Sequence, residues 1–146
     1  MIKFVDKEFI VENNTECVLV IDVDMHGAWE TGYHEQMRYA FPRAYDIYRE
    51  ACLKGNDIVG SSMIIEDSGY KIAILFVKKH RKDLKEKLLK NFSKALADML
   101  QKVPSDLWIY SPILGRKDKA FNELIVEINR QTYLQKNNWF IYKKEF

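Results

Sequence analysis

Charged residues and glycines that could take part in catalysis or ligand binding gather in three short segments, each directly after an apolar run. The segments are residues 22–29 (DVDMHGAW), 78–82 (KKHRK) and 111–121 (SPILGRKDKAF). In open α/β sheets, ligands bind at the carboxyl ends of the strands. If the apolar runs are strands of one sheet, a ligand would therefore bind at these segments.

The first segment begins with closely spaced acidic residues. Asp22, Asp24 and His26 would share one side of the strand if it continued that far, which would suit a divalent metal. Alternatively, the two acids bond to backbone amides of the loop. The run VLVIDVD is also similar to the opening motif of haloacid-dehalogenase-like phosphatases. That resemblance implies a later acidic pair for magnesium, and no GD or DD pair follows in this sequence.

A large aromatic residue, Trp29, ends the same segment between Gly27 and Gly32. Glycines permit a close approach of the backbone to a ligand. The indole ring could stack on an adenine or cover a pocket. The alternative is that it plugs one end of the core.

The second segment contains consecutive residues that can carry positive charge, from Lys78 and Lys79 to Lys82. Together with the amino terminus of a following helix, they could hold a phosphate or a diphosphate; the alternative is a solvated basic edge. No base-stacking aromatic residues are interleaved here, so the pattern argues against a dedicated nucleic-acid surface.

The third segment leaves a strand, turns at Gly115 and enters a helix. Asp118 is placed either to cap that helix or to act in catalysis. Ile113 precedes the turn and would face the same ligand as Gly115.

Six short segments rich in β-branched and aromatic residues predict strands. They are Ile2 to Val5, Cys17 to Val23, Met63 to Glu66, Lys71 to Val77, Leu107 to Ser111 and Asn138 to Tyr142. The second is apolar without alternation, which is typical of a strand covered on both faces. The turn Asp67-Ser68-Gly69 predicts that the third and fourth strands form a hairpin.

Helical patterns separate most of the strands. An apolar stripe with three- and four-residue spacing predicts a helix from about Asp83 to Gln101, and Phe121 to Ile128 marks another. Tyr33 to Ala51 predicts a helix in two pieces, with Pro42 as the first residue of the second. This alternation predicts an α/β protein: a three-layer α/β/α sandwich with a mixed, mostly parallel sheet of about six strands.

Composition narrows the classes of function. With 146 residues and 47% apolar residues, we expect one domain over 1–146. The formal net charge of +2 gives the chain no strong overall attraction for nucleic acid or anionic membranes. No membrane span or secretory signal is evident, so we expect a cytoplasmic protein. Two cysteines are too few for a disulfide framework or a zinc site.

The order of these landmarks resembles that of a divergent macro domain. The stretch FPRAYDIYREAC is similar to a segment common in the macro domains that remove ADP-ribose from proteins, and DLWIYSPILGRKDKAFNELI corresponds to the strand and second ligand loop. The resemblance implies a pocket for ADP-ribose or a related nucleotide and no cofactor or metal. It places the catalytic Lys at Lys78 or Lys79 and the catalytic Asp near Asp118. The small size and divergence suggest a phage or accessory-gene product.

The resemblance also assigns the two ligand loops. The first would contain Asp22 or Asp24 where the family has an Asn, followed by Gly27, Trp29 and Gly32; the second would contain Ile113 and Gly115. This sequence has Glu30 where small residues are usual and has lost the middle glycines of the second loop. Three functions therefore remain as alternatives. The protein could remove ADP-ribose from protein carboxylates, bind the nucleotide without catalysis, or use a degenerate fold to contact a protein partner.

All of these functional hypotheses depend on one geometric prediction. The backbone leaving Val23 and the backbone leaving Ser111 must lie side by side around a hollow that admits a diphosphate. Trp29 and Phe121 filling that space would exclude a nucleotide.

Overall fold

Strands and helices alternate along the chain in the computed structural model, which describes residues 2–8, 17–30, 32–116, 118–133 and 135–144. The strands in this part of the chain are β1 (Ile2–Glu8), β2 (Cys17–Asp24), β3 (Ser62–Asp67), β4 (Tyr70–Lys78), β5 (Trp108–Pro112) and β6 (Trp139–Lys144). The helices are α1 (Gly32–Ala40), α2 (Pro42–Leu53), α3 (Lys85–Lys102) and α4 (Phe121–Thr132). Every predicted strand and helix is present, with ends shifted by a few residues.

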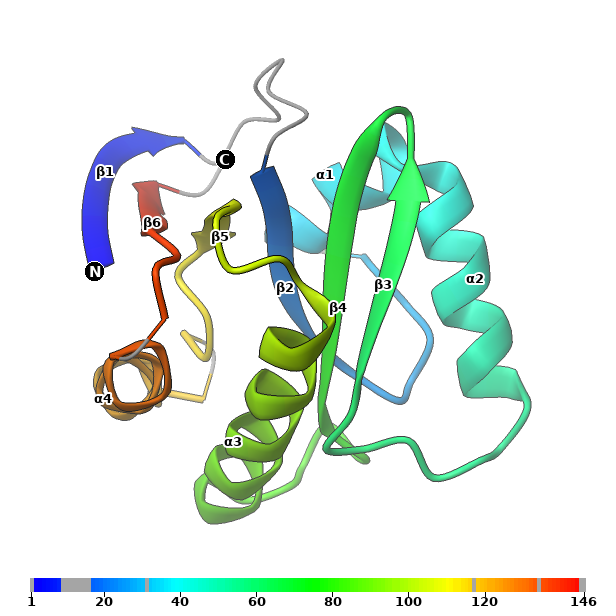
Figure 1. The fold of residues 1–146 in the computed structure, drawn as a ribbon. Helices are drawn as coiled ribbons and strands as arrows, with labels where there is room; N and C mark the ends of the chain where they lie inside the picture. The colour runs from blue at the N-terminus through cyan, green and yellow to red at the C-terminus, as the bar shows by residue number, and fades with distance from the viewer. Residues whose placement is uncertain (1, 9–16, 31, 117, 134, 145–146) are drawn as a thin grey trace.

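The strands form one six-stranded sheet in the order β1-β6-β5-β2-β4-β3. All neighbouring pairs are parallel except β3 and β4. The sheet lies between α1 and α2 on one face and α3 and α4 on the other (Figure 1). The predicted α/β/α sandwich with a mixed, mostly parallel sheet is therefore confirmed.

Each face of the sheet has its own hydrophobic core, which explains why β2 is apolar without alternation. Leu19 and Ile21 pack toward α1 and α2, whereas Val18 and Val20 pack toward α3 and α4. All four side chains are buried. Because successive side chains of a strand point to opposite faces, a strand covered on both faces must be apolar at consecutive positions.

Two backbone breaks occur where the sequence predicts them. Ser68 and Gly69 have positive φ values of 54° and 83°, the conformation required at both central positions of a tight hairpin turn between β3 and β4. Pro42 occupies the first turn of α2 after Phe41, where its missing N–H costs no helical hydrogen bond. In the described residues, no helix is both long and apolar enough to cross a membrane.

Candidate functional site

The loops after β2, β4 and β5 meet at one edge of the sheet because these strands are parallel neighbours. Figure 1 shows the loops after β2 and β4 leaving the lower end of the sheet, where α3 also begins. A hollow of about 480 Å³ opens between the loops. This first hollow is lined by residues of all three segments, among them Asp22, Ala28, Lys78, Ile113, Gly115 and Asp118.

A buried carboxylate joins the first and third loops. Asp22 is 8% exposed, and its Oδ2 accepts a hydrogen bond from the Gly115 backbone N–H at 3.1 Å. Its Oδ1 accepts another from the Tyr33 hydroxyl, and the Asp22 carbonyl lies 2.6 Å from His34 Nε2. The prediction that the two turns lie side by side is therefore confirmed, and both carboxylate oxygens of Asp22 are engaged within the protein.

Only glycine fits the turn of the third loop. Gly115 has a φ of +69°, and a Cβ atom there would lie 2.6 Å from Leu124 Cδ1 on α4. Residues with a side chain rarely adopt this φ, and the contact would also displace a core leucine. The close approach of this backbone to α4 and to Asp22 fixes one wall of the first hollow.

An ion pair crosses the first hollow from the second loop to the third. Lys78 Nζ lies 2.9 Å from Asp118 Oδ1 and donates a further hydrogen bond to the Arg81 carbonyl at 2.7 Å. The Lys78 side chain is 13% exposed and that of Asp118 25%. Lys79 lines a different hollow. Of the two lysines that the sequence left open, Lys78 is thus the one beside Asp118.

The alternative that Asp118 caps the following helix is wrong. The residue at the cap of α4 is Ala120, and no side chain there makes a capping hydrogen bond. Asp118 lies in the turn before it, where its carboxylate turns toward Lys78 across the first hollow. The carboxylate thus pairs with a cation at the end of a neighbouring strand and not with the backbone amides of the helix that follows it.

The Trp29 ring packs into the core at the back of the first hollow. It is 1% exposed, stacks on Tyr48 with 5.0 Å between ring centroids and lies 5.3 Å from the ring of Tyr45. Of the two alternatives that the sequence left open for Trp29, the structure therefore supports the one in which the ring fills one end of the core. The residue also borders the first hollow. Trp29 and Phe121 do not fill the space between the loops.

Two tyrosines hold the loop after β2. The Tyr48 hydroxyl donates to the Asp24 carbonyl at 2.7 Å and accepts from the Gly27 N–H at 3.1 Å, and Tyr45 donates to the Gly27 carbonyl. Burial raises the pKa of Tyr48 well above its usual range, so this phenol stays protonated as a donor. Gly27 consequently belongs to the fixed part of the loop and does not line the first hollow, whereas Gly32 does.

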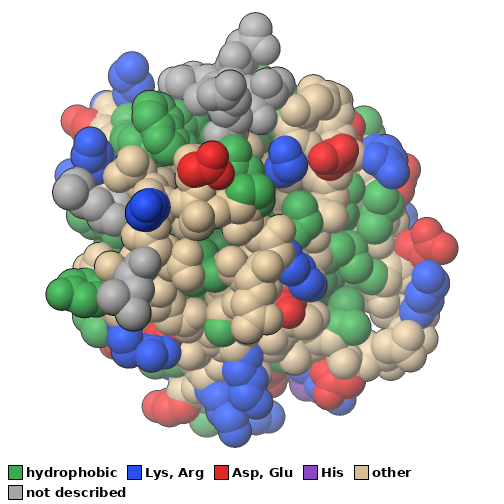
Figure 2. Space-filling view, in the orientation of Figure 1, with side chains coloured by type: hydrophobic (Ala, Val, Ile, Leu, Met, Phe, Trp, Pro, Cys, Tyr) green, Lys and Arg blue, Asp and Glu red, His purple; other side chains and the backbone are tan. Residues whose placement is uncertain are grey.

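Charges of both signs line the first hollow. Asp22, Asp24, Glu30 and Asp118 contribute carboxylates, and Lys78, Arg81 and Arg116 contribute cations. Arg81 Nε lies 3.8 Å from Asp24 Oδ2, and its side chain is 53% exposed. Figure 2 shows the same interspersion over the visible face, with a group of Lys and Arg side chains at its lower end.

The metal-cluster alternative is not supported. Among the residues that the structure describes, no group of three His, Cys, Asp or Glu side chains could hold a metal ion. Asp22 is turned toward Tyr33 and Gly115. Asp24 Oδ1 accepts from the His26 backbone N–H instead, at 2.8 Å, which matches the loop-bonding alternative.

Sequence reasoning missed several residues of the first hollow. Tyr33 and His34 begin α1 and reach back to Asp22, but the sequence identified them only as the start of a helix. Arg81 was counted only as a member of the basic run 78–82, and Arg116 only as a residue of the segment 111–121. The sequence did offer a signal for Tyr33 and His34. Both lie in the first turn of a helix that follows a ligand loop, and the first turn of such a helix faces the ends of the strands.

Comparisons with known proteins find their matches among solved structures. No family model matches the sequence, and no curated protein matches it. The macrodomain of Mycobacterium tuberculosis DarG is 18% identical with a TM-score of 0.79, and the alignment covers 99% of this chain and 98% of that one. The macrodomain of Thermus aquaticus DarG is 21% identical with a TM-score of 0.77, and covers 99% of both chains.

A structure of Thermosipho africanus DarTG in complex with ADP-ribose is also similar. It is 20% identical with a TM-score of 0.67, and the alignment covers 86% of this chain and 37% of that chain. At these identities the likeness concerns the fold. The chain has the macrodomain fold over nearly its whole length.

Proposed function

We propose that the first hollow binds ADP-ribose or a closely related nucleotide. The observation that carries the proposal is the pair of loops joined by the Asp22 to Gly115 hydrogen bond, with a hollow of about 480 Å³ between them. Pockets for small ligands commonly have volumes of about 300 to 1,000 Å³. A protein of the same fold has been solved with ADP-ribose bound, which supports this choice of ligand.

Groups along the wall of the hollow suit a diphosphate ester. Arg81 is held by Asp24 only at 3.8 Å, so its guanidinium can turn to a phosphate with little loss. Arg116 lines the hollow from the opposite loop. Guanidinium groups bind phosphate oxygens in a two-point geometry.

The same hollow would remove ADP-ribose from a protein carboxylate through Lys78. Asp118 Oδ1 lies 2.9 Å from Lys78 Nζ and can accept a proton from the ammonium group, which leaves Lys78 as a nucleophilic amine. The amine attacks the anomeric carbon of the distal ribose. The bond from that carbon to the ester oxygen breaks, and its electron pair leaves with the carrier carboxylate. Water then attacks the same carbon, the bond from that carbon to Lys78 Nζ breaks, the departing amine takes a proton from the water, and Asp118 gives its proton to solvent as ADP-ribose is released.

Two observations favour the alternative of a non-catalytic module that contacts a protein partner. Glu30 lines the hollow, and a carboxylate close to a diphosphate would weaken its binding. The lysine and the aspartate are also bonded to each other. Under this alternative the fold is kept, and neither ADP-ribose binding nor turnover is expected.

A binding titration with a blocking variant tests the proposal. We expect ADP-ribose to bind by calorimetry and to raise the melting temperature, because a ligand of the folded state stabilises it. Ala28→Trp, in the lining of the hollow, should abolish both effects. Leu53→Trp, at a side chain that is 76% exposed, is the control and should bind normally. Absence of binding at millimolar ADP-ribose would reject the nucleotide and favour the protein-contact alternative.

A further inference from the structure

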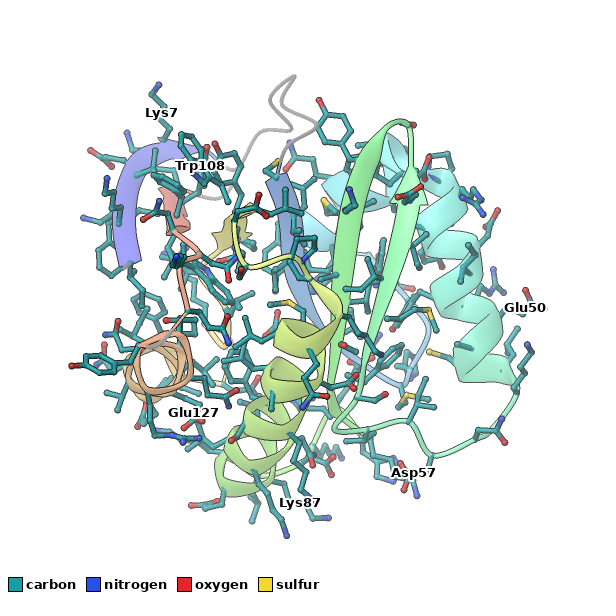
Figure 3. The ribbon with its side chains drawn as sticks, in the orientation of Figure 1. Lys7, Glu50, Asp57, Lys87, Trp108 and Glu127 are labelled. Carbon is teal, nitrogen blue, oxygen red and sulfur yellow. The ribbon has the colours of Figure 1, made fainter. Side chains whose placement is uncertain are left out.

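A second hollow of about 530 Å³ lies beside the first. It is lined by residues from the loops after β2, β4 and α2, including His26, Cys52, Asp57, Lys79, His80 and Arg81. Figure 3 shows Asp57 at the lower end of the molecule, on the connection between α2 and β3. The second hollow is thus at the same edge of the sheet as the first and on the α2 side of it.

A short strap of backbone, residues 24–26, contributes to both hollows, with Asp24 in the lining of the first and Met25 and His26 in that of the second. The strap follows β2 and is anchored by a hydrogen bond from the Met25 N–H to the Lys78 carbonyl at 2.9 Å, and by Tyr48 beneath it. Arg81 lines both hollows. The two hollows therefore adjoin at this side chain, so a ligand in the first lies next to the second.

Alternation at the end of β4 sends two adjacent lysines to different hollows. Lys78 lines the first and is paired with Asp118. Lys79 lines the second, and no ion pair to its ammonium group is found in the described part of the chain. The Asp83 carboxylate accepts hydrogen bonds from the backbone N–H groups of Lys79 and His80 at 2.9 and 3.1 Å. This fixes the turn while leaving both side chains at the rim.

The rim of the second hollow therefore carries groups that can bind an anion. Lys79 contributes a positive charge at the rim, His26 and His80 contribute imidazoles that can donate hydrogen bonds, and Asp57 is the acid among the lining residues. Arg81 is shared with the first hollow, where it lies near Asp24. Burial raises the pKa of the Cys52 thiol, so the floor of the hollow is neutral. A ligand with one or two carboxylates would match this rim.

We infer that the second hollow binds the acidic peptide segment that carries the ADP-ribosylated carboxylate. The inference rests on the proposed function, since a modified side chain in the first hollow must continue into its polypeptide. The ammonium group of Lys79, which no part of the first hollow uses, suits a flanking Glu or Asp residue. A nucleic-acid strand would need a longer series of basic groups and aromatic rings for stacking, whereas imidazoles are the ring side chains in this lining.

Binding of matched probes tests the inference. The probes are ADP-ribose, a ten-residue peptide bearing ADP-ribose on a non-hydrolysable link with flanking Glu residues, the same peptide with flanking Gln, and a single-stranded DNA ten-mer with the same link. We expect the Glu peptide to bind about fivefold more tightly than the Gln peptide. Lys79→Glu should remove that difference. The control Lys82→Glu makes the same charge change at a residue that lines neither hollow and should keep it.

The outcomes separate the two proposals. ADP-ribose affinity should stay within about twofold in both variants, because neither residue lines the first hollow. If ADP-ribose binds but the Glu and Gln peptides are equal, or if Lys82→Glu acts like Lys79→Glu, the peptide site is rejected and the nucleotide site stands. Tighter, Lys79-dependent binding of the DNA probe would overturn the choice of a peptide. Failure of ADP-ribose itself to bind rejects the proposed function, and this inference with it.

Discussion

Lys78 and Lys79 are adjacent in the sequence and lie in opposite environments. Lys78 is largely buried in the first hollow, where its ammonium group bonds Asp118 and the Arg81 carbonyl. Lys79 is exposed at the rim of the second hollow, where its backbone N–H bonds Asp83 and its ammonium group has no ion-pair partner among the described residues. Because both residues are lysines, their different surroundings come from the direction in which each side chain points at the end of β4.

The two hollows differ in the same way as the two lysines. In the first, Lys78 is paired with Asp118, and the buried Asp22 bonds Tyr33 and Gly115 and so ties the walls together. In the second, the charges stand on an exposed rim and most are basic. Groups in the first hollow should therefore govern stability and chemistry, whereas groups around the second should govern the affinity for the carrier of the substrate.

The largest contrast is expected in turnover. With a peptide that carries ADP-ribose on a glutamate, Lys78→Met should lower kcat about a hundredfold or more, because the attacking amine is lost. Lys79→Met should leave kcat within about twofold and raise KM, because it changes only the rim. Release of ADP-ribose measured by chromatography provides both constants. Full activity of Lys78→Met would contradict its role as the nucleophile.

A smaller contrast is expected in stability. Asp22→Asn replaces one acceptor oxygen with an NH₂ group, so either the Tyr33 hydroxyl or the Gly115 N–H loses its buried partner. The free energy of unfolding should fall by about 2 kcal/mol. Asp57→Asn makes the same chemical change at the exposed rim of the second hollow and should change it by less than about 0.5 kcal/mol. Urea denaturation would measure both, and equal effects would show that Asp22 does not tie the loops.

The smallest effect concerns the turn that presents Lys79. Hydrogen bonds from the His80 and Lys79 backbone N–H groups lower the pKa of Asp83 below its ordinary value of 3.8. A lowered pKa in the folded state means that the carboxylate stabilises the fold above that ordinary value, and that this stabilisation is lost as the pH falls through the lowered pKa.

Asp83→Asn should therefore be slightly less stable than the natural chain at pH 6, and the difference should shrink as the pH falls below 3.8 and through the lowered pKa. Urea midpoints of the two proteins at several pH values would measure it. A difference that stays constant between these pH values would mean that the loss comes from packing and that the Asp83 charge does not support the turn.

The sequence alone was sufficient for the fold because its signals are local. The unbroken apolar run at β2, the stripe of α3 and the Ser68-Gly69 turn each reflect the conformation of a few consecutive residues. Pro42 likewise starts α2 through the fixed φ of its own ring. Parallel strands and intervening helices then restrict the arrangement to a sheet covered on both faces.

The sequence also determined which loops form the first hollow, because parallel strands bring their carboxyl ends to one edge. Only the tertiary structure decided between Lys78 and Lys79, turned Asp118 from a helix cap into the partner of Lys78, and placed Tyr33 and His34 beside Asp22. These outcomes depend on contacts between residues up to 93 positions apart, such as Gly115 and Asp22. Local propensity describes the backbone of each segment, whereas the direction of a side chain at the end of a strand is fixed by the segments packed against it.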